Sequence, residues 1–136
     1  MAVRIAALVV FAAVLMLPAA AVRAQAPVVG DPVKGKVVFE QCAACHALDD
    51  AKSAGPSLKG MFGRKAGSRD DFRYSVAMTR SGIVWDAATL DAYLADPLAY
   101  IKGNRMSFAG VTGKTERDDL ISFLEQVTQT EPGPTR

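Results

Sequence analysis

The two cysteines and the single histidine of this chain stand together in the stretch Cys42-Ala43-Ala44-Cys45-His46. A C-x-x-C-H sequence is typical of the covalent attachment of a c-type haem. Two thiols separated by two residues on a helical turn can each add across a vinyl group at one porphyrin edge, and the adjacent imidazole then lies beneath the iron. A chain with this pattern has to fold around a large, flat ligand.

Three other interpretations of the cysteine pair compete with haem attachment. A dithiol redox pair should lie near a strand-helix-strand pattern, which the sequence lacks. A structural zinc site needs four ligands, and outside the motif the chain has no other cysteine or histidine. A local disulfide is possible in an oxidising compartment, but it gives the neighbouring histidine no role. Haem attachment is the interpretation that accounts for all three residues.

Iron held by His46 needs a second axial ligand, and with no other histidine the choice falls mainly on a methionine. The candidates after the N-terminal apolar segment are Met61, Met78 and Met106. A methionine is most often a filler of the core, and we expect that role for Met61 and Met78. Met106 lies in a loop bounded by two glycines, where it can close over the other haem face. The predicted iron ligands are therefore His46 and Met106.

Residues 1–24 have the features of a secretory signal peptide. Arg4 gives a positive start, residues 5–17 form an apolar run that is short for a membrane span, and Pro18 ends it. Small residues follow, so we expect cleavage before Gln25. The alternative is an uncleaved membrane anchor. With cleavage, the protein would be exported to the periplasm.

The remaining residues 25–136 suffice for one domain, with a core expected over about 31–128 and a flexible tail over 129–136. Cleavage would remove two of the 16 basic residues, which leaves as many as the 14 acidic ones. A nearly neutral chain makes nucleic acid an unexpected partner. The charge is nevertheless uneven, because basic residues exceed acidic ones over 52–80.

Aspartates mark where several helices should begin. Asp31 precedes Pro32 and Asp96 precedes Pro97, so a carboxylate can cap the free amides while proline takes the first helical position. Asp86 can cap a helix in the same way. The pattern predicts short helices from Asp31 toward the cysteine pair, near 75–79, after Asp86, over 97–101 and from Thr115 onward. Strand signals are weak, so the predicted class is all-α.

The predicted last helix begins at Thr115, whose spacing to Asp118 resembles a capping box. Its expected buried face consists of Leu120, Ile121, Phe123, Leu124 and Val127. Residues 47–81, in contrast, show little helical periodicity. A loop of this length is unusual in a compact domain unless it wraps something other than its own side chains, which indicates a large buried ligand.

Over residues 31–127 the sequence resembles mitochondrial cytochrome c and its short bacterial relatives of class I. The matching stretches are Gln41-Cys42-Ala43-Ala44-Cys45-His46, Gly55-Pro56-Ser57-Leu58, Phe62-Gly63-Arg64-Lys65, Gly82-Ile83-Val84-Trp85, Tyr93-Leu94, Pro97, Tyr100-Ile101, Met106-Ser107-Phe108-Ala109-Gly110 and Thr115-Glu116-Arg117-Asp118-Asp119-Leu120. The resemblance implies the all-α cytochrome c fold, in which short helices and long loops surround one covalently bound haem. Its first and last helices should cross near Gly35, Phe39 and Phe123.

The resemblance also implies a set of haem-binding residues. They are Cys42, Cys45, His46, Pro56, Arg64, Tyr74, Trp85, Tyr93, Asn104 and Met106. The Pro56 carbonyl would accept the imidazole proton of His46. Arg64, Tyr74 and Trp85 would lie near the haem propionates, where one cation and two donors can offset buried carboxylates.

The chain departs from the mitochondrial pattern close to the expected methionine ligand. Tyr93 would lie beside the Met106 sulfur, as in the family. Asn104 and Arg105, however, stand where the mitochondrial proteins have threonine and lysine, and Met78 stands where an asparagine is common. The strong overall basicity of the mitochondrial proteins is missing too, a difference that concerns the partner more than the haem chemistry.

The expected function is that of an electron carrier and not of an enzyme. Iron with both axial positions filled by His46 and Met106 offers no site for a substrate. The partners that the resemblance implies are a quinol-oxidising cytochrome bc complex, a terminal oxidase, a photosynthetic reaction centre or a periplasmic dehydrogenase, each docked transiently to a monomer. Two alternatives are a haem enzyme or gas-binding protein with an open sixth position, and a dedicated subunit of one dehydrogenase. A basic ring of Lys52, Lys59, Lys65 and Arg105 is expected around the haem edge.

Overall fold

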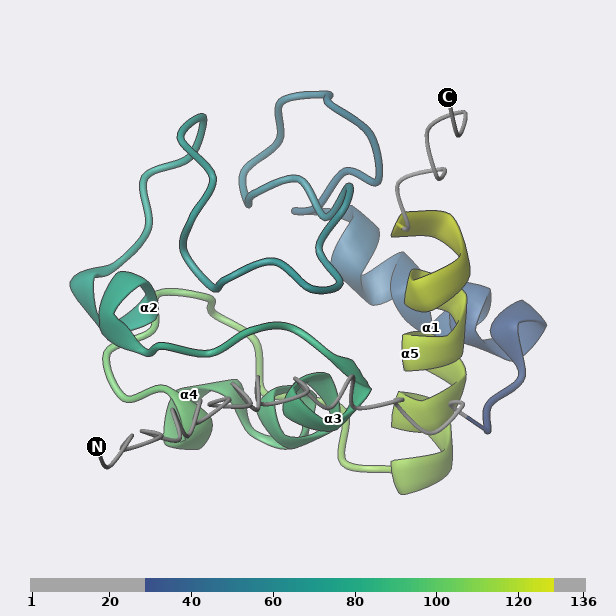
Figure 1. Ribbon diagram of the computed structural model, residues 1–136. Coiled ribbons are helices and arrows are strands. Elements are labelled where there is room, and N and C mark those ends of the chain that lie inside the picture. The colour runs from purple at the N-terminus through teal and green to yellow at the C-terminus, as the bar shows by residue number, and fades with distance from the viewer. Residues whose placement is uncertain (1–28, 129–136) are drawn as a thin grey trace, which may run out of the picture.

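The computed structural model describes residues 29–128, which form five α-helices joined by long loops (Figure 1). The helices are α1 (Pro32–Ala43), α2 (Val76–Arg80), α3 (Ala87–Ala95), α4 (Pro97–Tyr100) and α5 (Lys114–Thr128). The β pairing in this range is one antiparallel bridge between Lys65 and Val84, so the all-α class is confirmed. No helix in these hundred or so residues is both long and apolar enough to span a bilayer. The predicted signal peptide, 1–24, and tail, 129–136, lie outside the described residues.

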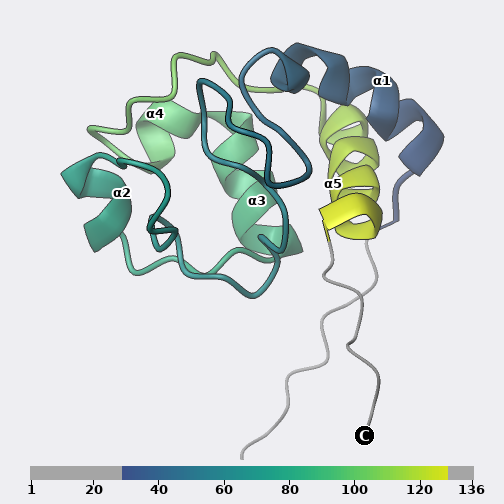
Figure 2. The ribbon, with the colours of Figure 1, turned by 90° about the horizontal axis from the view of Figure 1, so that it is seen from above.

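Helices α1 and α5 cross at close range and join the two ends of the described chain (Figure 2). Asp31 caps α1, and its own amide donates to the Asp119 carboxylate of α5 at 2.7 Å. Gly35 permits the close approach, because a Cβ atom there would lie 1.9 Å from the Asp119 carbonyl oxygen. Next to it the rings of Phe39 and Phe123 pack with their centroids 5.5 Å apart. The crossing expected at these residues is confirmed.

The shorter helices begin at side-chain caps. Ser75, Asp86 and Asp96 each accept a hydrogen bond from the amide three residues later, at 3.1, 2.7 and 3.0 Å. The Thr89 hydroxyl accepts in return from the Asp86 amide at 2.8 Å, which completes a capping box. These caps satisfy amides that have no partner inside a helix, and they explain why such short helices form. The predicted aspartate caps are confirmed.

Helix α5 differs from its prediction at both ends. It begins at Lys114, so Thr115 lies inside the first turn, and the predicted capping box from Thr115 to Asp118 is wrong. Val127, which we expected in the core, is 39% exposed, whereas Thr128 is only 1% exposed. The Thr128 hydroxyl can be buried because it donates to a carbonyl one turn earlier at 2.7 Å. The other predicted core residues of this helix, Leu120, Ile121, Phe123 and Leu124, are buried.

Arg117 ties α5 to α3 and to the loop that follows α4. Its Nε donates to the Asp91 carboxylate at 2.8 Å, and its Nη1 donates to the carbonyls of Val111 and Thr112 at 2.8 and 2.9 Å. The residue is nearly buried, so each bond replaces water that the guanidinium and the carbonyls have lost. A planar group with several fixed donors suits three acceptors in different directions.

We expect Arg117→Lys to lower the free energy of unfolding by about 1–3 kcal/mol, because an ammonium cannot reach all three acceptors and leaves buried carbonyls unsatisfied. Denaturant unfolding of the haem-loaded protein measures this. Lys114→Gln is the matched control, since Lys114 also pairs with Asp91 but is exposed, and it should cost less than about 1 kcal/mol. Equal losses in the two variants would contradict the proposed role of Arg117.

Candidate cofactor site

A cavity of about 680 Å³ lies between the helices and the long loops. Its walls include the apolar residues Leu90, Leu94, Leu120 and Leu124 of α3 and α5, and the segment between α1 and α2 closes another side. The volume is within the range of cofactor sites. All ten residues that the sequence indicated line this one cavity: Cys42, Cys45, His46, Pro56, Arg64, Tyr74, Trp85, Tyr93, Asn104 and Met106. A buried ligand accounts for the long loop.

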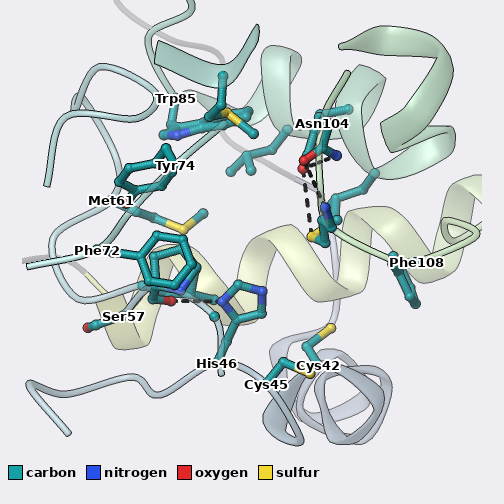
Figure 3. A pocket seen from close by; sticks show the side chains of 18 of the residues that line it. Cys42, Cys45, His46, Ser57, Met61, Phe72, Tyr74, Trp85, Asn104 and Phe108 are labelled. Carbon is teal, nitrogen blue, oxygen red and sulfur yellow. Dashed lines mark hydrogen bonds between the residues drawn. The ribbon is translucent and has the colours of Figure 1, made fainter. Parts of the chain in front are cut away.

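The two cysteines lie at the end of α1, where the chain leaves the helix. The amides of Cys45 and His46 both donate to the Cys42 carbonyl at 3.0 Å, and this turn directs both thiols to one edge of the cavity (Figure 3). The thiols are not joined in a disulfide. Burial, and secondarily the neighbouring Cys45, raises the pKa of the Cys42 thiol. A raised pKa disfavours the free thiolate that dithiol exchange requires, so it argues against a dithiol redox pair.

The His46 ring is held in one orientation by the loop beneath it. Its Nδ1 lies 2.8 Å from the Pro56 carbonyl oxygen, and since a carbonyl can only accept, Nδ1 carries the proton. In the neutral imidazole this bond selects the tautomer in which Nε2 has a free lone pair, and that tautomer is the form that binds a metal. Gly55 allows this packing, because a Cβ atom there would lie 2.7 Å from His46 Cε1.

Tyr74 and Trp85 offer hydrogen-bond donors at the end of the cavity away from the cysteines (Figure 3). Arg64 lines the cavity beside them, because its carbonyl accepts from the Trp85 amide at 3.0 Å. The Arg64 guanidinium donates to the carbonyls of Lys59 and Ser57 at 2.6 and 3.3 Å, and within residues 29–128 no carboxylate pairs with it. Burial lowers the pKa of Arg64 and raises that of Tyr74. A half-buried cation beside two donors suits the carboxylates that a haem carries at one edge.

The Met106 sulfur is held from the other side of the cavity. The Tyr93 hydroxyl donates to Met106 Sδ at 3.6 Å, and Asn104 bridges the two residues by donating to the Tyr93 oxygen at 2.9 Å and accepting from the Met106 amide at 3.0 Å. Burial raises the pKa of Tyr93 to about 12, so its hydroxyl stays protonated. His46 and Asn104 lie across the cavity from each other (Figure 3).

The sequence predicted the burial of the two remaining methionines but not their place in the cavity wall. Met61 and Met78 are buried, as expected for core residues, but both line the cavity. The Met61 side chain reaches into it (Figure 3). Leu58 and Phe72 of the long loop line it as well and were not predicted. No local pattern distinguishes such residues from ordinary core, because only the path of the loop decides what they face.

The donor set therefore fits a c-type haem. Two thiols lie at one edge, and an imidazole nitrogen and a thioether approach from different sides. Arg64, whose guanidinium has no carboxylate partner in the described part of the chain, lies beside Trp85. Within residues 29–128 no group of three or more histidine, cysteine or carboxylate side chains could hold a separate metal ion.

The chain is similar to several known proteins. Residues 32–128 match the family model described as "Cytochrome c". The chain is 47% identical over 103 residues to cytochrome c2 of Rhodomicrobium vannielii, which covers 74% of this chain and 82% of that one. It is 45% identical over 94 residues to cytochrome c-550 of Bradyrhizobium diazoefficiens, covering 68% and 69%. The solved structure of cytochrome cH from Methylobacterium extorquens superposes with a TM-score of 0.68 at 39% identity, covering 71% of this chain and 99% of that one.

Proposed function

The chain belongs to the cytochrome c family, and on this premise we propose that it carries single electrons through the periplasm between a quinol-oxidising cytochrome complex and a terminal oxidase, a photosynthetic reaction centre or a periplasmic redox enzyme. Like the family, it is an electron carrier and not an enzyme, and it holds one haem c through Cys42 and Cys45. Haem c supplies an iron that alternates between ferrous and ferric states. The protein holds the haem and orients the side chains that would bind its iron.

One observation carries the proposal: a fixed imidazole and a fixed thioether face one cavity. His46 is oriented by Pro56, and the Met106 sulfur is oriented by Tyr93. His46 and Met106 would both hold the iron, which would leave no open position for a substrate or a gas. This distinguishes a carrier from a haem enzyme or a gas-binding protein.

Carbon monoxide tests this distinction. The reduced protein should bind carbon monoxide slowly and weakly, because the gas has to displace Met106 first. Rapid stoichiometric binding would instead indicate an open sixth position. Mixing the reduced protein with isolated membrane complexes identifies the partner, since the physiological acceptor should oxidise it and an unrelated complex should not.

The cavity opens to solvent beside Gln41, Cys45, Ala54, Arg105 and Ser107, which line it and are exposed. A transferred electron would leave at this mouth, because the other residues that line the cavity are buried or only partly exposed. Small, short-lived interfaces are typical of redox partners and require complementary charge around such an opening.

Two of the four basic residues expected around the haem edge are poorly suited to docking. Lys59 forms an ion pair with Asp50, so its charge is largely neutralised. Lys65 is exposed but flanks Arg64 at the far end of the cavity. Arg105 lies on the rim and Lys52 lies two residues from Ala54, and within residues 29–128 neither has an acidic partner. We therefore assign docking chiefly to Lys52 and Arg105.

A further inference from the structure

The departure from the family pattern at Asn104 has a consequence for the direction of hydrogen bonds around Met106. The three bonds among Tyr93, Asn104 and Met106 form a closed ring (Figure 3). If one group in such a ring can only donate, it fixes the direction of every other hydrogen bond in the ring.

The Met106 amide is that donor. A backbone N–H can only donate, so the atom of Asn104 that faces it at 3.0 Å is Oδ1. The other end of the amide group, Nδ2, carries hydrogens and no lone pair, and it lies 2.9 Å from the Tyr93 oxygen. Tyr93 must therefore accept from Asn104 and cannot donate to it. The phenol proton is left for the Met106 sulfur, 3.6 Å away.

The main chain of Asn104 and the ring of Tyr93 are also fixed by their neighbours. The backbone N–H of Asn104 donates to the Ile101 carbonyl at 2.9 Å, and the turn that this bond closes passes through Gly103 at a φ of 88°. The Tyr93 ring is fixed between the rings of Trp85 and Tyr100, with centroids 5.0 and 6.3 Å away. The Asn104 backbone and the Tyr93 ring are thus both held in place.

We infer that Asn104 is a positioning residue that directs the Tyr93 hydroxyl proton onto one lone pair of the Met106 sulfur and leaves the other lone pair for the iron. The inference rests on the proposed role of Met106 as axial ligand. A hydrogen bond draws electron density from the sulfur, so the thioether stabilises ferric iron less. Asn104 therefore raises the reduction potential without touching the metal.

Asn104→Asp tests the inference, because a carboxylate keeps the bond from the Met106 amide but also accepts from Tyr93. The phenol proton then turns away from the sulfur, and the reduction potential should fall. Part of the fall comes from the added charge. The same substitution in the Tyr93→Phe background carries the charge effect alone, so the fall should be smaller there. Ser107→Asp is the control, because it adds the same charge at the exposed residue that follows Met106 in the chain. It should lower the reduction potential equally in the wild-type and Tyr93→Phe backgrounds.

An equal fall for Asn104→Asp in both backgrounds would overturn the inference. If that variant does not fold, Asn104→Ala replaces it in the same cycle, and its effect on the potential should likewise shrink in the Tyr93→Phe background. Failure of the proposed function is detected separately. If the ferric methionine charge-transfer band survives Met106→Ala, the proposed ligation by Met106 is wrong. If that band is lost but Asn104→Asp lowers the reduction potential equally in the wild-type and Tyr93→Phe backgrounds, only the role of Asn104 is wrong.

Discussion

Met106→Ala should keep the covalent haem but lower the reduction potential and open the iron to external ligands. The thioether is lost while Cys42, Cys45 and His46 stay in place. The reduction potential of a haem varies over roughly 0.8 V with the identity of its axial ligands. We therefore expect the potential of Met106→Ala to fall by at least about 0.1 V, a small part of that range. Redox titration measures the fall, and a cyanide or imidazole titration of the ferric protein measures the opening.

Met61→Ala and Met78→Ala are the matched controls, because both residues are methionines that line the same cavity. Each should reduce stability by about 2–5 kcal/mol, as buried methionine truncations do, and leave the ferric methionine charge-transfer band intact. Loss of that band in a control, together with its retention in Met106→Ala, would move the ligand to the control position.

Reversal of the charges at the cavity mouth should slow electron transfer to the physiological acceptor. We expect Lys52→Glu and Arg105→Glu each to lower the second-order rate roughly fivefold at low ionic strength, which corresponds to about 1 kcal/mol for an exposed charge contact. Added salt should slow the wild-type protein, since exposed charges are screened beyond about 8–10 Å at ordinary ionic strength. Stopped-flow kinetics over a salt series measures both effects.

The controls for docking use cations that are paired or distant from the mouth. Lys59→Glu should have a smaller effect because Asp50 already neutralises that lysine, and Lys34→Glu on α1 should have almost none. Arg105 also donates to the Arg73 carbonyl and adjoins Met106, so the reduction potential of its variant has to be checked. A wild-type rate that salt does not change, or equal losses in all four variants, would exclude steering by the rim.

Several features of the site followed from the sequence because they depend on neighbours in the chain. The spacing of Cys42, Cys45 and His46 indicated the cofactor, and a carboxylate before proline at residues 31 and 96 located two helix starts. Such signals operate within one turn of helix, where a few residues make all the relevant hydrogen bonds. The resemblance extended this to distant residues such as Trp85, which lines the cavity as expected.

Other features depended on contacts between segments that are far apart in the chain, and only the tertiary structure decided them. The sequence by itself determined the helical class, the haem motif and the residues around it. The path of the chain decided that Thr128 and not Val127 is buried, that Asp50 neutralises Lys59, and that Asn104 sets the direction of the Tyr93 hydroxyl. Burial and proton direction are properties of a three-dimensional neighbourhood, which no local pattern specifies.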